Sequence, residues 1–448
     1  MLQYKIYYVM SRNQIQGKTA AEIASSVEKT LHAGLSGGSR LPTIRGLART
    51  LRVSPVTVAA AYRLLQSRGL IVGGGRRGTH VRPVAHASGP VATPATVVEG
   101  ALDLASGNPD PDLLPSLAPH LRALNPSQRL YGDAPEFRPL VAFASAEFEA
   151  DGIAASDVTV TIGALDAVER VLRAHLRPGD GVLVEDPTLP ALLDLIRSLG
   201  HTPHPCAIDD EGPEPEAVDR ALNAQVRAAI LSPRAQNPTG AAITSGRAAD
   251  LTRVLGRHAN TLLIELDSAG PISGVPVITL IDPARPHWAI VKSTSKCLGP
   301  DLRIAVMAAD ALTSGRVQRQ QALGIRWVSH VLQSLTLALW SDPSTGRRLA
   351  RAAEVYRQRR TALIEALASH DIAAHGASGF NVWVPVREET ATVGALAARG
   401  WAVAAGERFR LKSAPAIRVT TSALEPIAAQ RFAADLAEIL RPSVATSA

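Results

Sequence analysis

Between residues 158 and 296, short apolar runs alternate with longer segments whose apolar residues recur at helical spacing. Five of the runs are typical of strands: VTVTIG (158–163), GVLVEDP (181–187), AAIL (228–231), TLLIELD (261–267) and AIVKSTSK (289–296). Segments such as ALDAVERVLRAHL, which lie between them, are typical of helices. This alternation predicts an α/β domain with a mainly parallel sheet that helices cover on both faces.

Ligands of such sheets bind at the carboxyl ends of the strands, so the residues at those ends are the candidates for a site. In chain order they are Gly163 and Ala164, Asp186 and Pro187, PRAQNPTG (233–240), Glu265 and Asp267, and STSK (293–296). A lysine amine can condense with an aldehyde, an Asn amide can donate to a phenolate, and a carboxylate can pair with a pyridine nitrogen. Ser, Arg and backbone N–H groups can hold a phosphate. Pyridoxal phosphate has all four features, so these strand ends predict a site for it.

The first 82 residues differ from the rest of the chain in charge. They hold 13 Lys and Arg against 2 acidic residues, whereas the remainder holds 34 against 38, within a net charge of +7. This imbalance predicts a basic N-terminal module that binds a polyanion. An incidental solvated basic face is the alternative.

The N-terminal module has the pattern of a helix-turn-helix with a wing. Helical spacing covers residues 19–33, 43–51 and 56–69, and the tight turn RVSP separates the last two helices. The segment LIVGGGRRGTHVRP then predicts two short strands about a glycine turn. In such modules the second helix enters the major groove, and the turn and wing contact phosphates.

A segment rich in Pro, Ala, Gly, Ser and Thr joins this module to the α/β body. We therefore expect a DNA-binding domain at 1–82, a semi-stiff linker at 83–100 and a body at 101–448, with a small α+β subdomain at about 345–448. A length of 448 residues suits two or three domains. No apolar run approaches the roughly 20 residues that span a bilayer, and no signal peptide is apparent, so we expect a cytoplasmic protein without a membrane partner.

The N-terminal module resembles the winged helix-turn-helix of GntR-type transcription regulators. The signature positions matched are Leu41, Pro42, Arg45, Leu47, Ala48, Leu51, Val53, Ser54, Thr57, Val58, Ala61, Tyr62 and Leu65. The resemblance implies that the DNA contacts are Thr43, Arg45, Ser54, Thr57, Arg68, Arg76 and Arg77. It implies core positions for Leu47, Val58, Tyr62 and Leu65. Pro55 departs from the arginine that members often carry, although proline suits the first position of a helix.

The body resembles fold-type-I aminotransferases through SGNPDPDLLP, YGD, TIGALDAVERVL, VEDPT, QNPTG and STSKCLGPDLR. Joined to the winged module, it resembles the MocR subgroup of the GntR regulators. The resemblance implies that Lys296 forms the Schiff base, that Asn237 bonds the ring hydroxyl, and that Arg418 binds a substrate or effector carboxylate. Phosphate contacts are implied for Gly163, Ala164, Ser293 and Arg303, and Tyr131 is expected to reach the phosphate of a neighbouring copy across a dimer interface. Lys292 is expected to be a surface lysine.

One motif departs from the pattern of these regulators. They usually carry EDD where this chain has IELD, so Leu266 replaces the first acid of the pair. Because adjacent strand residues face opposite sides, either the pyridine nitrogen lacks a carboxylate or a bulge brings Asp267 to it. Ser268 and Leu189 also stand where an aromatic or histidine side chain is common. All three departures weaken catalysis more than binding.

These features predict a homodimeric transcription regulator that binds a double-stranded DNA operator and senses pyridoxal phosphate or a small amino compound. Transaminase activity should be weak or absent, and we expect no metal site. Two alternatives stay open. Lys296 and Arg418 favour a working aminotransferase with an incidental N-terminal module, and a sensor of vitamin B6 alone is the third reading. Cys206 and Cys297 are expected to be buried thiols.

Overall fold

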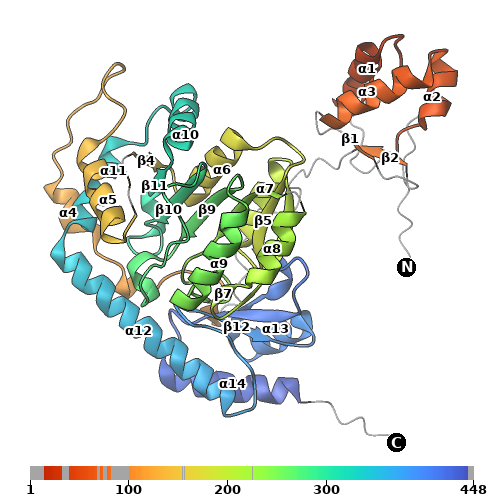
Figure 1. Ribbon diagram of the computed structural model, residues 1–448. Helices are drawn as coiled ribbons and strands as arrows, with labels where there is room; N and C mark the ends of the chain where they lie inside the picture. Colours follow the sequence, from red (N-terminus) through yellow and green to blue (C-terminus); the bar gives the residue numbers. More distant parts are fainter. Residues whose placement is uncertain are drawn as a thin grey trace, which may run out of the picture. The chain divides into compact units, whose positions relative to one another are not determined.

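The computed structural model of this chain describes residues 15–32, 40–67, 71–73, 78–81, 100–153, 155, 157–224 and 226–441. The predicted contacts Arg68, Arg76 and Arg77, and nearly all of the linker, lie outside these residues. The chain forms two compact units, one containing Met1–Thr93 and the other Pro94–Leu176 and Asp180–Ala448 (Figure 1).

The N-terminal unit contains the predicted helix-turn-helix and the two wing strands. Its elements are α1 (Ala20–His32), α2 (Ile44–Leu51), α3 (Pro55–Ser67), β1 (Ile71–Gly73) and β2 (Thr79–Val81), the last two paired antiparallel. Arg52 makes the turn between α2 and α3 in the left-handed conformation, with φ of 54°, and its N–H donates to the carbonyls of Ala48 and Arg49. Helix α3 begins at Pro55, as its fixed φ favours.

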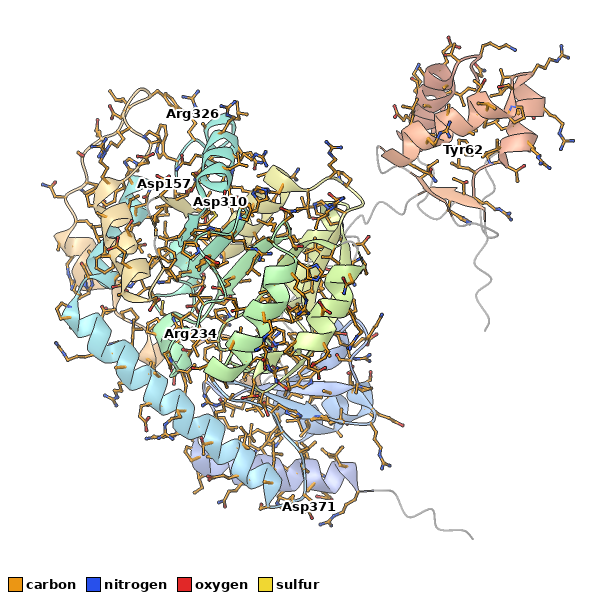
Figure 2. The ribbon with its side chains drawn as sticks, in the orientation of Figure 1. Tyr62, Asp157, Arg234, Asp310, Arg326 and Asp371 are labelled. Atoms are coloured by element: carbon orange, nitrogen blue, oxygen red, sulfur yellow. The ribbon has the colours of Figure 1, made fainter. Side chains whose placement is uncertain are left out.

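The core of this unit is the one that the sequence predicted. Leu47, Val58, Tyr62 and Leu65 are all buried. The Tyr62 hydroxyl donates to the Pro42 carbonyl at 2.7 Å, which ties α3 to the segment before α2 (Figure 2). Burial raises the pKa of Tyr62. The first and second helices of the motif are thus held together by a packed core and one buried hydrogen bond.

The second unit is built on a mixed sheet with the strand order β4-β11-β10-β9-β8-β5-β6-β7. Its strands are β4 (Val158–Thr161), β5 (Gly181–Asp186), β6 (Thr202–Asp209), β7 (Gly212–Pro213), β8 (Val226–Leu231), β9 (Leu262–Asp267), β10 (Trp288–Ser293) and β11 (Ala305–Ala309). Strands β6, β5, β8, β9 and β10 are neighbours in this order and are parallel, as predicted. Strand β7 runs antiparallel to β6, and β11 runs antiparallel to both β10 and β4. The sequence did not predict β11, which returns directly after β10 without a crossover helix.

Helices cover both faces of this sheet. Helices α6 (Ala164–His175) and α7 (Pro190–Ser198) pack on one face, in a core that includes Ile264 and Leu266 of β9. Helices α5 (Arg138–Ala150), α8 (Pro215–Asn223) and α9 (Ser245–Arg257) contribute to a second core with Leu263. Neighbouring residues of β9 therefore alternate between the two faces, as pleating requires.

A smaller sheet with the order β12-β14-β13-β3 forms the subdomain near the C-terminus. Its strands are β3 (Leu102–Leu104), β12 (Asn381–Pro385), β13 (Trp401–Ala405) and β14 (Ala416–Thr420), and its helices are α13 (Glu389–Ala398) and α14 (Pro426–Leu440). The sequence placed this subdomain at about 345–448, yet β3, from the very start of the body, pairs in parallel with β13. The segment that follows the linker therefore belongs to the small sheet.

The remaining helices are α4 (Leu117–Ala123), α10 (Ala311–Leu323), α11 (His330–Trp340) and α12 (Pro343–Ala368). Short 3-10 turns lie at Pro111–Leu113, Gly270–Ser273, Pro300–Leu302 and Gly406–Arg408. Figure 1 shows α12 as the long helix that runs from the side of α4 and α11 to α14. Among the residues with a described structure, no helix is both long and apolar enough to cross a membrane.

Candidate cofactor site and nucleic-acid interface

Three neighbouring strands bring the predicted phosphate-binding residues to one edge of the large sheet. Ser293 of β10 pairs with Ala305 of β11, and Ala305 pairs with Thr161 of β4. Because β11 is antiparallel to its two neighbours, its beginning lies beside their carboxyl ends. The segments that hold Gly163, Ser293 and Arg303 therefore leave the sheet at the same edge.

Gly163 and Arg303 form a close pair at this edge. Gly163 has φ of 82° and stands before the first residue of α6, where no side chain caps the helix. A Cβ at this position would lie 2.9 Å from an Arg303 guanidinium nitrogen. Arg303 itself has φ of 51° and forms no ion pair with a described residue. A helix N-terminus and an uncompensated guanidinium at one place favour an anion, and a phosphate fits them.

Lys296 lies three residues beyond Ser293, in the loop that leaves β10. Its Nζ donates to the Gly107 carbonyl at 2.6 Å. Burial and the neighbouring Arg418 lower the pKa of Lys296 to about 8. A larger fraction of its amine is therefore neutral near pH 7 than for an ordinary lysine, and a neutral amine is the form that attacks an aldehyde.

Arg418, on β14 of the small sheet, reaches the same place and is only 4% exposed. It donates to Asn237 Oδ1 at 3.1 Å and to the Ala105 carbonyl, and its guanidinium lies 4.8 Å from the centre of the Phe409 ring. Burial lowers its pKa to about 10. Its Nε is buried without a hydrogen-bond partner among the described atoms. A buried donor of this kind fits a carboxylate ligand, because unsatisfied buried donors are uncommon.

The segment after β3 lies across these residues and supplies acceptors to them. Ala105 and Gly107 accept from Arg418 and Lys296, and the next carbonyl, that of Asn108, accepts from the Ser422 hydroxyl at 2.6 Å. We call residues 105–108 the strap. The strap thus contacts both functional side chains and follows the linker with only β3 between them.

Leu266 and Asp267 face opposite sides of β9. The pairing of β9 with β10 runs without a shift through Leu266 and Asp267, so no bulge changes the frame. Leu266 lies in the core against which Ala164 and Leu189 pack, on the side of the phosphate-binding edge. The Asp267 carboxylate accepts from Arg234 at 2.7 and 3.1 Å and from the Gly270 N–H at 2.9 Å. Figure 2 labels the position of Arg234. The contact of Asp267 with the cofactor remains a prediction, and its observed partner is Arg234.

Lys292 is not the surface residue that the sequence suggested. It is 8% exposed, its Nζ lies 2.6 Å from Asp151 Oδ2, and the ammonium lies 4.2 Å from the centre of the Phe148 ring. The expectation failed because Lys292 points from β10 toward the end of α5, where Phe148 lies in the last turn and Asp151 follows the helix. It is a structural ion pair.

Tyr131 is not brought to Lys296 within this chain. It is 81% exposed and packs edge-on against Trp327, with 5.8 Å between the ring centres. The centre of its ring lies 4.9 Å from the guanidinium carbon of Arg326, which is labelled in Figure 2. The role of Tyr131 in a neighbouring copy stays a prediction.

The polar residues predicted to contact DNA lie at the starts of α2 and α3. Thr43 caps α2, with Oγ1 accepting the Gly46 N–H at 3.1 Å. Ser54 accepts the Thr57 N–H at 3.1 Å, and the two hydroxyls lie 2.8 Å apart. Arg45 is exposed, as are Arg49 and Arg52, and none of the three has an ion pair among the described residues.

Sequence reasoning missed Val56, the second residue of α3. It is 71% exposed, although Val58, two positions later, is fully buried. The helical spacing could have revealed it, because residues two apart lie on different sides of a helix.

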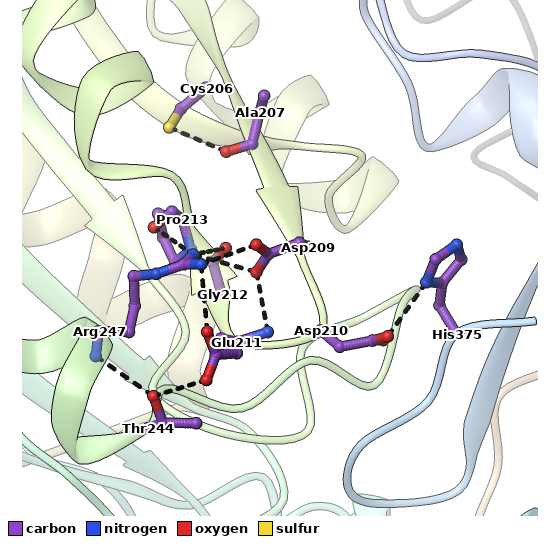
Figure 3. A network of polar contacts seen from close by, with 10 residues as sticks. All are labelled: Cys206, Ala207, Asp209, Asp210, Glu211, Gly212, Pro213, Thr244, Arg247 and His375. Atoms are coloured by element: carbon purple, nitrogen blue, oxygen red, sulfur yellow. Dashed lines mark hydrogen bonds and ion pairs between the residues drawn. The ribbon is translucent and has the colours of Figure 1, made fainter.

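A polar network links the large sheet to the small subdomain away from Lys296 (Figure 3). At the turn between β6 and β7, the Asp209 carboxylate accepts from Arg247 at 2.7 and 3.0 Å. The next residue, Asp210, lies 3.2 Å from His375 Nδ1, and His375 pairs through its backbone with Trp383 of β12. The Asp210 carboxylate accepts from His375 Nδ1, and this hydrogen bond raises the pKa of His375.

Comparison with known proteins covers both units. The family model for aminotransferase class I and II matches residues 99–436, and the model for bacterial regulatory proteins of the gntR family matches residues 19–81. The vitamin B6 salvage pathway transcriptional repressor PtsJ of Salmonella typhimurium is 40% identical over 434 residues, covering 95% of this chain and 99% of that protein. The pyridoxine biosynthesis transcriptional regulator PdxR of Corynebacterium glutamicum is 25% identical over 346 residues, covering 74% of this chain and 75% of that protein.

Solved structures resemble the second unit. An archaeal alanine:glyoxylate aminotransferase has a TM-score of 0.69 at 20% identity and covers 77% of this chain and 91% of its own. The α-aminoadipate aminotransferase LysN of Thermus thermophilus, solved with N-(5'-phosphopyridoxyl)-L-leucine, has a TM-score of 0.66 at 24% identity and covers 77% and 93%. These similarities establish the fold-type-I aminotransferase architecture.

Proposed function

The chain belongs to the MocR-type regulators, in which a GntR helix-turn-helix is fused to an aminotransferase class I and II domain, and from this we propose that it controls transcription in response to pyridoxal phosphate bound at Lys296. Aminotransferases of this class use pyridoxal phosphate. The 40% identical relative is a repressor of vitamin B6 salvage, which favours the cofactor itself as the effector over an unrelated amine.

One observation carries the proposal. Lys296, whose amine has a pKa of about 8, and Arg418, whose buried Nε has no partner among the described atoms, both lie against Gly107, in a chain that also carries a DNA-binding motif. In this proposal Lys296 would bind an aldehyde and Arg418 would bind an anionic group. An isolated structural lysine would need neither feature.

Each residue of the site has a task that its position allows. Pyridoxal phosphate supplies an aldehyde that a lysine amine can bind covalently. Lys296 would provide that amine, and Arg303 with the N-terminus of α6 would hold the phosphate. Asn237 accepts from Arg418 through its oxygen, so its amide N–H groups remain available to donate to the ring hydroxyl. Arg418 would bind the carboxylate of an amino compound.

The strap gives the site a route to the linker. When Lys296 bonds a cofactor, it gives up the donor role toward the Gly107 carbonyl, and a carboxylate at Arg418 competes with the Ala105 carbonyl. Both changes loosen residues 105–108, which continue through β3 into the linker. We therefore propose that the strap transmits occupancy of the site.

A working aminotransferase is the second candidate, because Lys296 and Arg418 are both present. Leu266 weighs against it. A carboxylate at the pyridine nitrogen keeps the ring protonated and so makes it an electron sink, and leucine cannot do this. We therefore propose that the protein is a regulator whose transaminase activity is weak or absent. We also propose that it is a homodimer and that it acts in the cytoplasm.

DNA binding by the full-length protein tests the proposal. Fluorescence anisotropy with a labelled fragment from upstream of its own gene should show affinity that falls steeply with salt, since each neutralised phosphate adds about −0.9 to the log–log slope. Pyridoxal phosphate should change this affinity in the natural protein and leave it unchanged in Lys296→Ala. Absence of salt-dependent binding to any upstream fragment, or an equal response in Lys296→Ala, would refute it.

A further inference from the structure

Helix α3 presents one apolar side chain to solvent at its first turn, which is the part of such a helix that meets DNA. Val56 is 71% exposed, whereas the other valine of the helix, Val58, is in the core. In a helix-turn-helix, the N-terminal residues of the second helix contact base edges in the major groove. Single exposed apolar residues are common on protein surfaces, so the position of Val56 is what makes it notable.

The neighbouring polar groups are less free to read bases. The Ser54 and Thr57 hydroxyls lie 2.8 Å apart, and Ser54 also accepts the Thr57 N–H. Pro55 has no N–H and no polar side chain. These hydrogen-bonding groups at the start of α3 thus serve to begin the helix, and Val56 stands between them in the sequence with its side chain exposed.

Arginines on the adjacent surface provide the charge for phosphate contacts. Arg45 and Arg49 on α2, and Arg52 in the turn, are exposed and lack ion pairs with described residues. Phosphate contacts position a protein on DNA without selecting sequence. Direct reading of the sequence comes from groups at the base edges, and Val56 stands at the helix start that reaches those edges in such motifs.

The chemistry of valine identifies its partner. In the major groove, each base pair presents donors, acceptors or the C5-methyl group of thymine, and only this methyl is apolar. We propose that Val56 packs against the C5-methyl group of one thymine in each half-site and so selects A·T over G·C there. The inference rests on the proposed DNA-binding function and specifies the base that one residue reads.

The size of the effect follows from the buried methyl group. Burial of one methyl or methylene is worth about 0.8 kcal/mol, and about 1.4 kcal/mol corresponds to a tenfold change in affinity. Removing the thymine methyl should therefore weaken binding roughly fourfold, and only at the base that Val56 contacts.

Replacement of thymine by uracil tests this directly, because it removes the methyl and nothing else. With the full-length protein and an operator located by footprinting on its own upstream fragment, each thymine is changed to deoxyuridine in turn. We expect a loss of roughly fourfold at one position per half-site. In Val56→Ala, the logarithm of the affinity loss caused by the same thymine-to-uracil change should be less than about half of its value in the natural protein. A double-mutant cycle of Val56 and the thymine methyl measures this difference.

Two variants serve as controls. Ile44→Ala removes another exposed apolar side chain of the motif, at the start of α2, and should leave the uracil penalty unchanged. Val56→Thr retains one methyl group and should retain most of the penalty. Val56→Ala should fold, because the side chain is exposed and alanine has the higher helix propensity; circular dichroism checks this.

The outcomes separate this inference from the proposed function. Salt-dependent operator binding without any uracil-sensitive position, or with a penalty that is the same in Val56→Ala, overturns the inference alone. Failure to bind any upstream fragment overturns the proposed function and the inference with it. A penalty that disappears in Ile44→Ala as well would assign the effect to the fold of the motif and would also overturn the inference.

Discussion

The reactivity of Lys296 depends on its surroundings at the residue scale. Burial is the larger cause of its lowered pKa, and the positive charge of Arg418 adds to it. A lysine amine is positively charged below its pKa, so burial and a neighbouring cation both favour the neutral form. The site therefore favours capture of an aldehyde near neutral pH.

Cofactor capture should follow the ionisation of this amine. The rate of trapping pyridoxal phosphate with cyanoborohydride should rise with pH and level off above a midpoint near 8. In Arg418→Met the midpoint should move upward, because the cation is lost while burial remains. Trapping should be absent in Lys296→Ala and normal in Lys412→Ala, a variant of an exposed lysine. A midpoint above 10 would show that the amine is ordinary.

Leu266 should determine how poor a catalyst the natural protein is. We expect negligible conversion of bound pyridoxal phosphate to pyridoxamine phosphate with common amino acids. Leu266→Asp should raise the single-turnover rate by about tenfold or more, equal to about 1.4 kcal/mol per factor of ten, because the new carboxylate can stabilise the protonated ring nitrogen. Leu266→Asn, of similar size without charge, is the control.

The opposite result would concern Asp267. Brisk turnover by the natural protein, or loss of the cofactor in Asp267→Asn with no gain in Leu266→Asp, would make Asp267 the partner of the ring nitrogen. The observed pairing of Asp267 with Arg234 makes us expect that Asp267→Asn loses stability instead.

At individual residues, the sequence predicted a position well where nearby residues determine it, and poorly where a contact distant in the chain determines it. Gly163 and Lys296 follow the ends of predicted strands, whereas Arg303 precedes β11, and the register of β10, β11 and β4 brings the three segments to one edge. Their contacts with a cofactor stay a prediction. Lys292 was misplaced because its partner Asp151 is 141 residues away. Arg234 was not recognised as the partner of Asp267, since no short motif marks a contact that only the sheet creates.

At the scale of elements, the sequence predicted the repeating parts and missed the exceptions. The winged motif and the parallel strands follow from periodicity and turn residues, and the family resemblance is confirmed by the matched models. Strand β11 breaks the alternation by returning antiparallel, and β3 is three residues long with its partner about 300 residues later in the chain. Neither strand pairing can be recognised from a pattern in the nearby sequence.

The contact between the β6–β7 turn and the small subdomain should depend on pH (Figure 3). Asp210, with support from Asp209, raises the pKa of His375 above its ordinary value of 6.5. The stabilisation is therefore fully present below about pH 6.5 and is lost as the pH rises through the pKa of the folded protein.

His375→Gln tests this contact. Since both side chains are nearly half exposed, the effect should be small: the variant should lower the melting temperature by about 1–2 °C at pH 5.5. Little difference should remain at pH 8.5. His370→Gln, which removes an exposed histidine at the end of α12, should show no such dependence. An equal shift at both pH values would mean that packing, not ionisation, links the two parts.

At the scale of the whole molecule, the proposed regulation needs a route from the site to the DNA-binding unit. The strap is our proposed route, because Gly107 touches both functional side chains. Its carbonyl accepts from Lys296, and a Cβ on it would lie 3.1 Å from two guanidinium nitrogens of Arg418. With φ of 69°, Gly107 also has a backbone conformation that other residues rarely adopt.

Gly107→Ala should therefore displace the strap whether or not a ligand is bound. The quantity to measure is the logarithm of the ratio of DNA affinities with saturating and without pyridoxal phosphate. In Gly107→Ala it should fall to less than about half of its value in the natural protein. The affinity of the unliganded variant should shift toward that of the liganded natural protein. Gly152→Ala places the same strain at a positive φ of 77° with open space around it, and should leave the response intact. If Gly107→Ala binds the cofactor covalently and keeps the full DNA response, occupancy reaches the linker by a route other than the strap.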